Sequence, residues 1–155
     1  MPLNQSQTTR LATQLEGLKL LRSAFDNAAL QKRPSNGKWT AHEQICHIGR
    51  AQDIFFDRFE RIITERMPPK IDRYNAEEDK EWTTFLQKTT DAAIDYTVRK
   101  RKELNEYLSQ VREGDLRKRG IHSAFGELTL DMWVEFFLVH EAHHLYSIVK
   151  LLQPR

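Results

Sequence analysis

Hydrophobic residues recur every three or four positions along most of the chain, the spacing that places them on one face of an α-helix. From about Gln7 to Leu30 this pattern predicts a first helix, with an apolar face formed by Leu11, Leu15, Leu18, Leu21 or Ala24, and Phe25. Residues 31–39 then hold a proline, a serine, an asparagine and a glycine in succession. Because proline and glycine interrupt helical hydrogen bonding, this segment is predicted to be a loop.

A capping box marks the start of the second predicted helix, at Thr40-Ala41-His42-Glu43. The threonine hydroxyl and the glutamate carboxylate can each satisfy an amide of the first turn. The helix is predicted to run to about Arg66, because Pro68 and Pro69 follow it. Its apolar positions are Ile45, Ile48, Ala51, Phe55, Phe59 and Ile62.

Two more helices are predicted downstream. Residues 75–111 contain neither proline nor glycine, but four threonines between positions 83 and 90 weaken the helical pattern, so the main helix is expected to begin between Glu81 and Gln87. Residues 113–127 contain three glycines and are predicted to form a loop with a short extended piece. Thr129 is the expected cap of the last helix, which ends near Leu152, before Pro154.

Four helices without a convincing strand pattern predict an all-α protein, a four-helix bundle. One domain is expected over residues 1–155, with a core of about 8–152. A composition of 39% hydrophobic and 30% charged residues is typical of a soluble globular protein and argues against a disordered one. No apolar run approaches ~18 residues, and the first ten residues lack a secretory signal pattern, so a cytoplasmic protein without a membrane partner is expected.

Charge and cysteine content narrow the possible chemistry. The single cysteine, Cys46, rules out an internal disulfide and a thiolate cluster, so any metal must be held by nitrogen or oxygen ligands. The net charge of +2 is mild, and the two basic runs are 99–102 and 117–119. Four consecutive helical residues spread around the helix, and acidic residues lie among them, so no nucleic-acid partner is expected.

Helical geometry, at about 100° per residue, sorts most of the six histidines. His47 lies near the centre of the apolar face of the second helix, whereas His42 points nearly opposite, toward solvent. In the last helix, His140 and His144 fall on the inner face and His143 lies on its flank. His122 and His143 are interpreted as solvated or satisfied surface residues.

His140 and His144 are one helical turn apart, so both imidazoles can reach a single ion, and His47 supplies a third nitrogen from another helix. Three neutral imidazoles leave open positions for water or substrate, which is typical of a catalytic rather than a closed structural site. For His47 taken alone, a hydrogen-bonded core histidine is the alternative interpretation. The predicted inner face offers few hydrogen-bond partners for these rings besides Gln52 and Ser147.

The run from His140 to His144 also matches the His-Glu-x-x-His pattern of zinc proteases, in which the glutamate activates water. Only eleven residues follow His144, and none is a histidine, aspartate or glutamate, so the third ligand must come from upstream. Glu141 is a candidate catalytic base or a partner of a ligand histidine. The alternative is a solvated or ion-paired glutamate.

The sequence resembles the DinB/YfiT-like superfamily of metal-dependent enzymes in three ordered segments, WTAHEQICHI (39–48), FGELTL (125–130) and HEAHHLYSI (140–148). The resemblance implies a four-helix bundle that holds one divalent metal ion with His47, His140 and His144, and it implies frequent homodimers. Nickel or zinc is expected first, with iron or manganese as alternatives. The sequence departs from the pattern at Ser147, where many members carry a glutamine.

The resemblance leaves the reaction open, because its members include thiol transferases, a thiol-dependent isomerase and the iron-binding part of sulfoxide synthases. We expect a metal acting as a Lewis acid in thiol transfer or hydrolysis, with a low-molecular-weight thiol or a small electrophile as substrate. The alternative is a non-catalytic, stress-linked metal-binding or scaffold protein. The candidates for the wall of an apolar pocket, or otherwise for core positions, are Ile48, Trp133, Phe136 and Phe137.

The last predicted helix is apolar on more than one side. Leu138, Leu145 and Val149 are expected to lie away from the histidine face. A helix that is apolar all round is either deeply buried or shared with a partner, which favours a homodimer.

Overall fold

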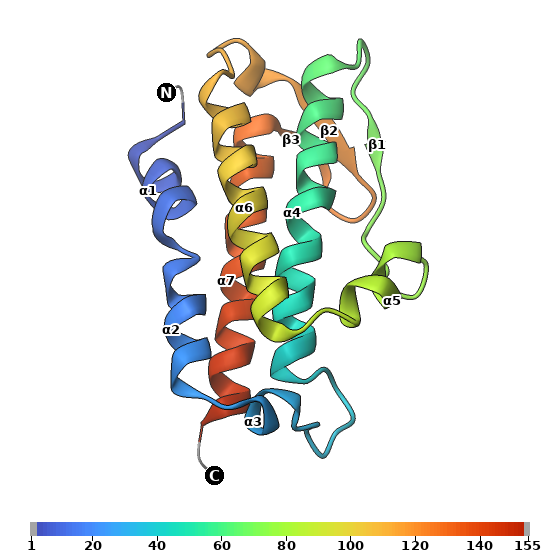
Figure 1. Cartoon of the computed structure of the whole chain (residues 1–155). Coiled ribbons are helices and arrows are strands. Elements are labelled where there is room, and N and C mark those ends of the chain that lie inside the picture. Colours follow the sequence, from blue (N-terminus) through green and yellow to red (C-terminus); the bar gives the residue numbers. More distant parts are fainter. Residues whose placement is uncertain (1–2, 154–155) are drawn as a thin grey trace.

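Four helical rods pack side by side in the computed structural model, which describes residues 3–153 (Figure 1). The first rod consists of α1 (Gln5–Thr13) and α2 (Glu16–Ala24), and the others are α4 (Ala41–Thr64), α6 (Thr90–Ser109) and α7 (Leu130–Leu152). α4 and α6 run in one direction, whereas the first rod and α7 run in the other. The predicted four-helix bundle is therefore confirmed.

The single first helix predicted from Gln7 to Leu30 is wrong, because the segment forms α1, α2 and a short α3 (Asn27–Gln31). Phe25 is extended, with φ −132° and ψ 140°, and the Asp26 side chain accepts a hydrogen bond from the Ala29 amide at 2.8 Å. An aspartate in this position starts a new helix instead of continuing the old one. The apolar pattern continues across these breaks, which is why it predicted one helix.

The predicted capping box at the start of α4 is confirmed. The Glu43 amide donates to the Thr40 hydroxyl at 3.1 Å, and the Thr40 amide donates to the Glu43 carboxylate at 2.7 Å. α4 ends two residues earlier than predicted, at Thr64, and its predicted apolar face is buried against α6 and α7.

The third helical region differs from its prediction in where the helices begin. A short helix, α5 (Lys80–Leu86), precedes the main helix α6, which begins at Thr90. The Thr89 hydroxyl accepts a hydrogen bond from the Ala92 amide at 3.2 Å and so caps α6. Two of the four threonines, Thr89 and Thr90, therefore mark the boundary where α6 begins, whereas Thr83 and Thr84 lie inside α5.

A three-stranded sheet packs beside the bundle, although no convincing strand was predicted. It is formed by β1 (Lys70–Ile71), β2 (Arg119–His122) and β3 (Gly126–Thr129), and a short 3-10 helix, η1 (Asp115–Arg117), precedes β2. β1 pairs with β2 in parallel, and β2 pairs with β3 in antiparallel fashion. Strands of two to four residues are too short to give a recognisable alternation, so only the short extended piece was predicted.

The last helix follows its prediction closely, from Thr129 at the cap position to an end at Leu152. The Thr129 hydroxyl donates to the Asp131 carboxylate instead of accepting from a first-turn amide. Leu138 is fully buried and does not line the cavity of the histidines, whereas Val149 is 38% exposed, so burial accounts for one part of the apolar surface expected away from the histidine face. Pro154 lies outside the described residues.

Two apolar clusters make up the core, and a polar layer separates them. On α4 one cluster includes Ile45 and Ile48, and the other begins at Ala51. On α7 the change from one cluster to the other falls between Leu138 and Ile148. The polar layer at this boundary consists of His47, Gln52, Arg101, His140, Glu141 and His144. Within residues 3–153, no helix combines the length and apolar character needed to cross a membrane.

Candidate metal centre

The structure brings together the three histidines predicted as ligands. His47 projects from α4, and His140 and His144 project from successive turns of α7. The Nε2 atom of His140 lies 3.1 Å from Nε2 of His47 and 3.2 Å from Nε2 of His144. One nitrogen from each ring falls within 4.8 Å of the other two. These residues form the group that could hold a metal ion in the described part of the chain.

The spacing of these nitrogens fits one divalent ion. Three nitrogens bound to an ion at about 2.0–2.1 Å lie roughly 3.0–3.4 Å apart, depending on the angle between them. The separations of 3.1 and 3.2 Å fall within this range. Each neutral imidazole has one N–H and one lone pair, so tautomers protonated at Nδ1 direct all three Nε2 lone pairs toward this point.

Burial lowers the pKa of all three imidazoles, because loss of solvent penalises their charged forms. The pKa falls to about 2 for His47, about 4 for His140 and about 3 for His144. For His47, repulsion from the other two rings adds to the effect of burial. All three rings are therefore neutral at neutral pH, which is the form that binds a metal.

The second nitrogen of each ring has different surroundings. Nδ1 of His144 lies 2.6 Å from the Gln44 side-chain oxygen, a partner that the sequence reasoning missed. Gln44 precedes His47 by three residues on α4, so the two side chains lie on nearly the same side of the helix. This i, i+3 spacing could have indicated Gln44 as a residue near the histidines. Nδ1 of His47 and of His140 is buried without a hydrogen-bond partner among the described residues.

Neither of the expected polar partners binds a histidine ring. Gln52 donates to the Glu141 carboxylate at 2.9 Å, and the Ser147 hydroxyl donates to a backbone carbonyl of its own helix. Aromatic rings surround His47 instead, with the ring centre of Trp39 at 5.0 Å and that of Tyr74 at 5.3 Å.

The three histidines line a cavity of about 730 Å³ that lies between α4, α7, the segment 73–77 and the β2–β3 hairpin. Of the four residues considered for an apolar pocket, Phe136 lines this cavity. Ile48, Trp133 and Phe137 are buried in the core, as the alternative interpretation had it. The other apolar and aromatic walls are Trp39, Ala51, Ile54, Phe55, Tyr74, Ala76, Trp82, Ala124 and Phe125.

Glu141 lies beside the ligand His140 in sequence but belongs to a different network. It is 1% exposed, it pairs with Arg101, and it accepts hydrogen bonds from Gln52 at 2.9 Å and Gln14 at 2.8 Å. It does not line the cavity. This geometry favours the ion-paired alternative for Glu141, and a role as a catalytic base stays a prediction.

The remaining histidines differ in how well their predictions hold. His42 was expected in solvent but is buried, and its Nδ1 lies 2.8 Å from the Thr90 hydroxyl at the start of α6. His122 is hydrogen-bonded as expected, but it is buried in β2 and lines the cavity, so its surface placement is wrong. His143 is exposed, as predicted.

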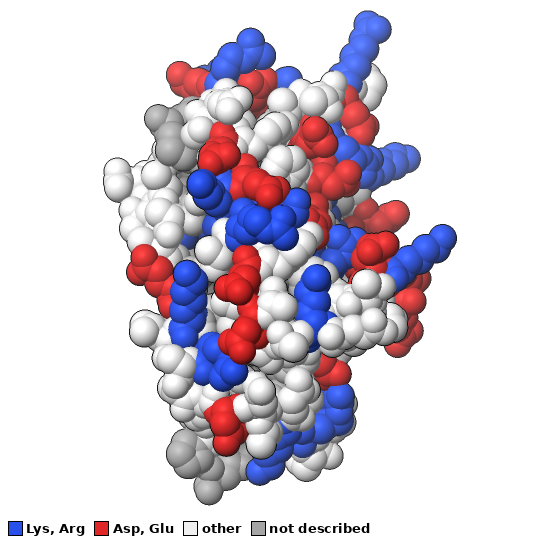
Figure 2. Space-filling model, in the orientation of Figure 1, with Lys and Arg blue, Asp and Glu red and all other residues white. Residues whose placement is uncertain are grey.

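Both basic runs pair with acidic residues, as the sequence suggested for the run 99–102. Arg101 is buried with Glu141, Lys100 donates to Glu103 at 2.8 Å, and Arg119 pairs with Glu127. Figure 2 shows blue and red side chains alternating over this face of the molecule.

The family model described as the DinB superfamily matches residues 8–148. No curated protein matches the chain by sequence. Among solved structures, the chain is similar to YfiT from Bacillus subtilis, with a TM-score of 0.79, 17% identity, and coverage of 94% of this chain and 83% of that one. YfiT is described as "a probable metal-dependent hydrolase with an unusual four-helix bundle topology".

A second similar structure is TT2238, described as a four-helix bundle protein. Its TM-score is 0.57 at 21% identity, and the match covers 94% of this chain and 97% of that one. At these identities the two structures support the fold alone. The family match covers most of the chain and includes all three histidines. The chain therefore belongs to the DinB superfamily.

Proposed function

We propose that this protein binds one divalent metal ion through His47, His140 and His144 and works as a metal-dependent hydrolase or thiol transferase. The observation that carries the proposal is the meeting of three neutral imidazole nitrogens at the wall of a cavity. Nickel or zinc is the first expectation, because both accept imidazole ligands readily.

A divalent ion held there supplies Lewis acidity, which lowers the pKa of a bound water or thiol and gives an anionic nucleophile at neutral pH. The chain's own contribution is to hold three neutral ligands from two helices and to surround them with apolar side chains. Trp39, Tyr74 and Trp82 exclude bulk water from one side of His47. The description of YfiT as a probable hydrolase supports the same class of reaction.

Metal analysis of the purified protein and two variants tests the ligand set. We expect one equivalent of metal in the wild type and a loss of affinity in His144→Ala that exceeds the about 10–100-fold typical of losing an outer hydrogen-bond partner. His143→Ala is the matched control, because the neighbouring His143 is exposed and outside the ligand set. Equal metal content in all three proteins would contradict the proposed site.

Activity assays decide between the two reactions and the non-catalytic alternative. The protein loaded in turn with nickel, zinc, iron or manganese is offered ester and amide substrates, and then electrophiles with bacillithiol, mycothiol or glutathione. Turnover that disappears in His144→Ala supports an enzyme and identifies its reaction class. A protein that binds metal but turns over no substrate, and gains large thermal stability from the metal, fits a structural or scaffold role.

A further inference from the structure

The cavity contains a buried cation that the proposed metal chemistry does not use. Arg58 lies on α4, is 7% exposed, and contributes to the cavity wall. Its Nη2 donates to the Asp72 carbonyl at 3.0 Å, whereas Nε and Nη1 have no hydrogen-bond partner among the described residues. The guanidinium also lies over the rings of Phe55 and Trp133, at 4.9 and 5.7 Å from their centres, which stabilises its charge but satisfies none of its remaining N–H donors.

Arg101, the other buried arginine of the described core, shows how this chain satisfies an arginine that has only a structural role. Arg101 is 4% exposed, pairs with the Glu141 carboxylate, and also donates to the Gln52 side chain and the Leu11 carbonyl. No described carboxylate forms an ion pair with Arg58, although the carboxylates of Asp53, Asp57 and Asp72 border a separate hollow that it also touches. Arg58 therefore keeps hydrogen-bonding capacity that the protein itself does not satisfy.

Arg58 lies on the same face of α4 as the ligand His47. The two are eleven residues apart, which corresponds to three helical turns with an offset of only about 20° and a rise of about 16 Å. The Arg58 guanidinium lies 4.9 Å from the ring centre of Phe55, and that ring lies 5.6 Å from the ring of His140. The positive charge of Arg58 is one of the causes of the lowered pKa of His140.

The cavity wall between these two ends is largely apolar. Ala51, Ile54 and Phe55 lie between His47 and Arg58 in the sequence of α4, and they contribute to the wall together with Phe136 of α7. The other charged residues of the wall are Arg73 and Glu77, both exposed. The wall of this space thus combines the three imidazoles of the metal site with the guanidinium of Arg58 and the nearby ring of His122, and apolar side chains make up most of the rest.

We propose that Arg58 is a specificity-determining residue that binds the carboxylate of an organic acid substrate with an apolar body. The claim that the other end of this substrate reaches a metal ion rests on the proposed function, whereas the claim that Arg58 binds its carboxylate does not. Arginine suits this role because its planar guanidinium offers several donors to one carboxylate, and an apolar setting strengthens the charge-assisted hydrogen bonds. Burial lowers the pKa of Arg58 to about 10, which leaves it charged at neutral pH.

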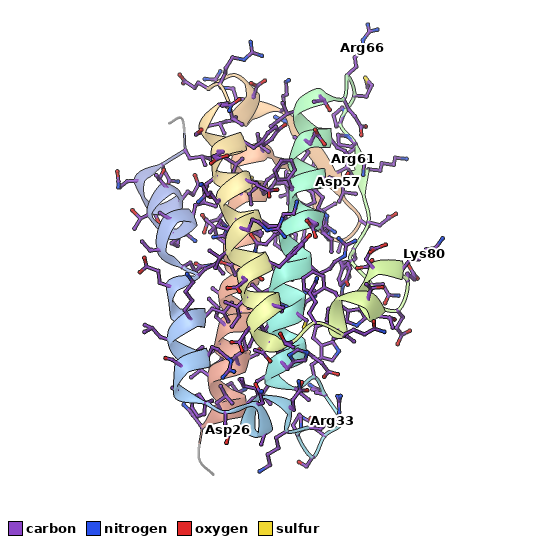
Figure 3. All side chains as sticks on the ribbon, in the orientation of Figure 1. Asp26, Arg33, Asp57, Arg61, Arg66 and Lys80 are labelled. Atoms are coloured by element: carbon purple, nitrogen blue, oxygen red, sulfur yellow. The ribbon has the colours of Figure 1, made fainter. Side chains whose placement is uncertain are left out.

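The competing interpretation is that Arg58 only ties the segment at β1 to α4. Arg61 provides the matched control for this, because it lies one turn away on α4 and its Nη2 donates to the Lys70 carbonyl in β1 at 3.3 Å. Figure 3 labels Arg61 and Asp57 on the side of α4 that faces β1. Arg61 is absent from the wall of the histidine cavity, so Arg61→Met removes the same charge and a similar tether without changing that wall.

The test is calorimetric binding of two probes of the same shape, 3-phenylpropanoate and the uncharged 3-phenylpropanamide, to the metal-free protein. The carboxylate is expected to bind about 10–100-fold more tightly than the amide, since hydrogen bonds to charged groups contribute at this level. Arg58→Met should abolish this preference, Arg58→Lys should retain part of it, and Arg61→Met should leave it unchanged. Thermal melting checks that each variant is folded.

Three results would overturn the proposal. These are equal affinity of the wild type for the two probes, an unchanged preference in folded Arg58→Met, and an equal loss in Arg61→Met. The comparison of probes on the wild type needs no variant, so the test survives if Arg58→Met fails to fold. Because no metal is present, a carboxylate preference stands even if the chain proves to have no catalytic activity. Failure of the metal site is detected separately by metal analysis.

Discussion

The ion pair between Arg101 and Glu141 places two charges at the middle of the bundle, where both side chains are almost fully buried, at 5% and 1% exposed. Gln14 and Gln52 donate the remaining hydrogen bonds to the carboxylate. Removing one partner of such a pair leaves the other charge buried and uncompensated. At the scale of the residue, Glu141 is therefore expected to matter for stability.

We predict that Glu141→Gln lowers the free energy of unfolding by about 3–5 kcal/mol in urea denaturation and leaves the metal content unchanged. The control is Glu135→Gln, which breaks the half-exposed pair with Arg10 and should cost no more than about 1 kcal/mol. A small stability loss combined with lost turnover would instead support Glu141 as a catalytic base.

Residue roles could be predicted from the sequence where helical geometry alone decides them. The inward positions of His47, His140 and His144 follow from the periodicity of two long helices. The burial of His42 and His122 could not, because each is covered by another element, the start of α6 for His42 and the aromatic rings of α7 for His122. Arg58 was missed for a similar reason, since its cavity is formed by three separate parts of the chain.

At the scale of the element, α4 and α6 make their close approach at Gly49. A side-chain carbon at this position would lie 2.7 Å from the Thr97 hydroxyl and 2.8 Å from the Phe85 ring. Contacts this short force the neighbouring side chains or helices to move. The glycine thus sets how closely α6 and the end of α5 pack against α4, two residues from the ligand His47.

We predict that Gly49→Ala destabilises the fold by about 1–3 kcal/mol, even though alanine is the better helix former. Gly17→Ala, on α2, is the matched control because no atom lies within 4 Å of the added carbon there. That control should stabilise the protein by about 0.5–1 kcal/mol. Thermal or urea unfolding of both variants measures the difference, and equal effects would contradict the packing argument.

The elements themselves were predictable to different degrees. α4 and α7 have local start and stop signals that agree with their apolar faces, and both were placed within two residues of their ends. The first segment was not placed correctly, because its apolar pattern continues across two helix breaks, one at Gln14–Leu15 and one at Phe25–Asp26. In the sheet, β1 pairs with β2 between residues about 50 positions apart, such as Lys70 with Ile121, which no local pattern reports, and the strands of the local β2–β3 hairpin are only four residues long.

At the scale of the whole molecule, α7 exposes a stripe of large apolar side chains. Met132, Val139 and Tyr146 are 51%, 55% and 62% exposed and lie seven residues apart, so they share one face of the helix. A repeated apolar stripe of this kind is suited to pairing with the same stripe on a second copy. The homodimer expected from the sequence stays a prediction, and we propose this stripe as its contact surface.

We predict that light scattering gives the mass of a dimer for the wild type and of a monomer for Val139→Glu, because a charge at the centre of the stripe cannot be buried without a partner. Leu20→Glu is the control, since Leu20 is 70% exposed on α2 and lies outside the stripe. A wild-type mass equal to one chain would exclude the dimer.

The polar layer between the two apolar clusters also determines how the helices align along their lengths. If α4 slid by one turn, about 5.4 Å, relative to α6 and α7, its imidazole and amide groups would face hydrocarbon, and the buried charges of the neighbouring helices would lose their partners. An apolar core alone tolerates such a shift far better, because one aliphatic side chain can replace another. The layer thus selects a single longitudinal alignment, and the three histidines meet only in that alignment.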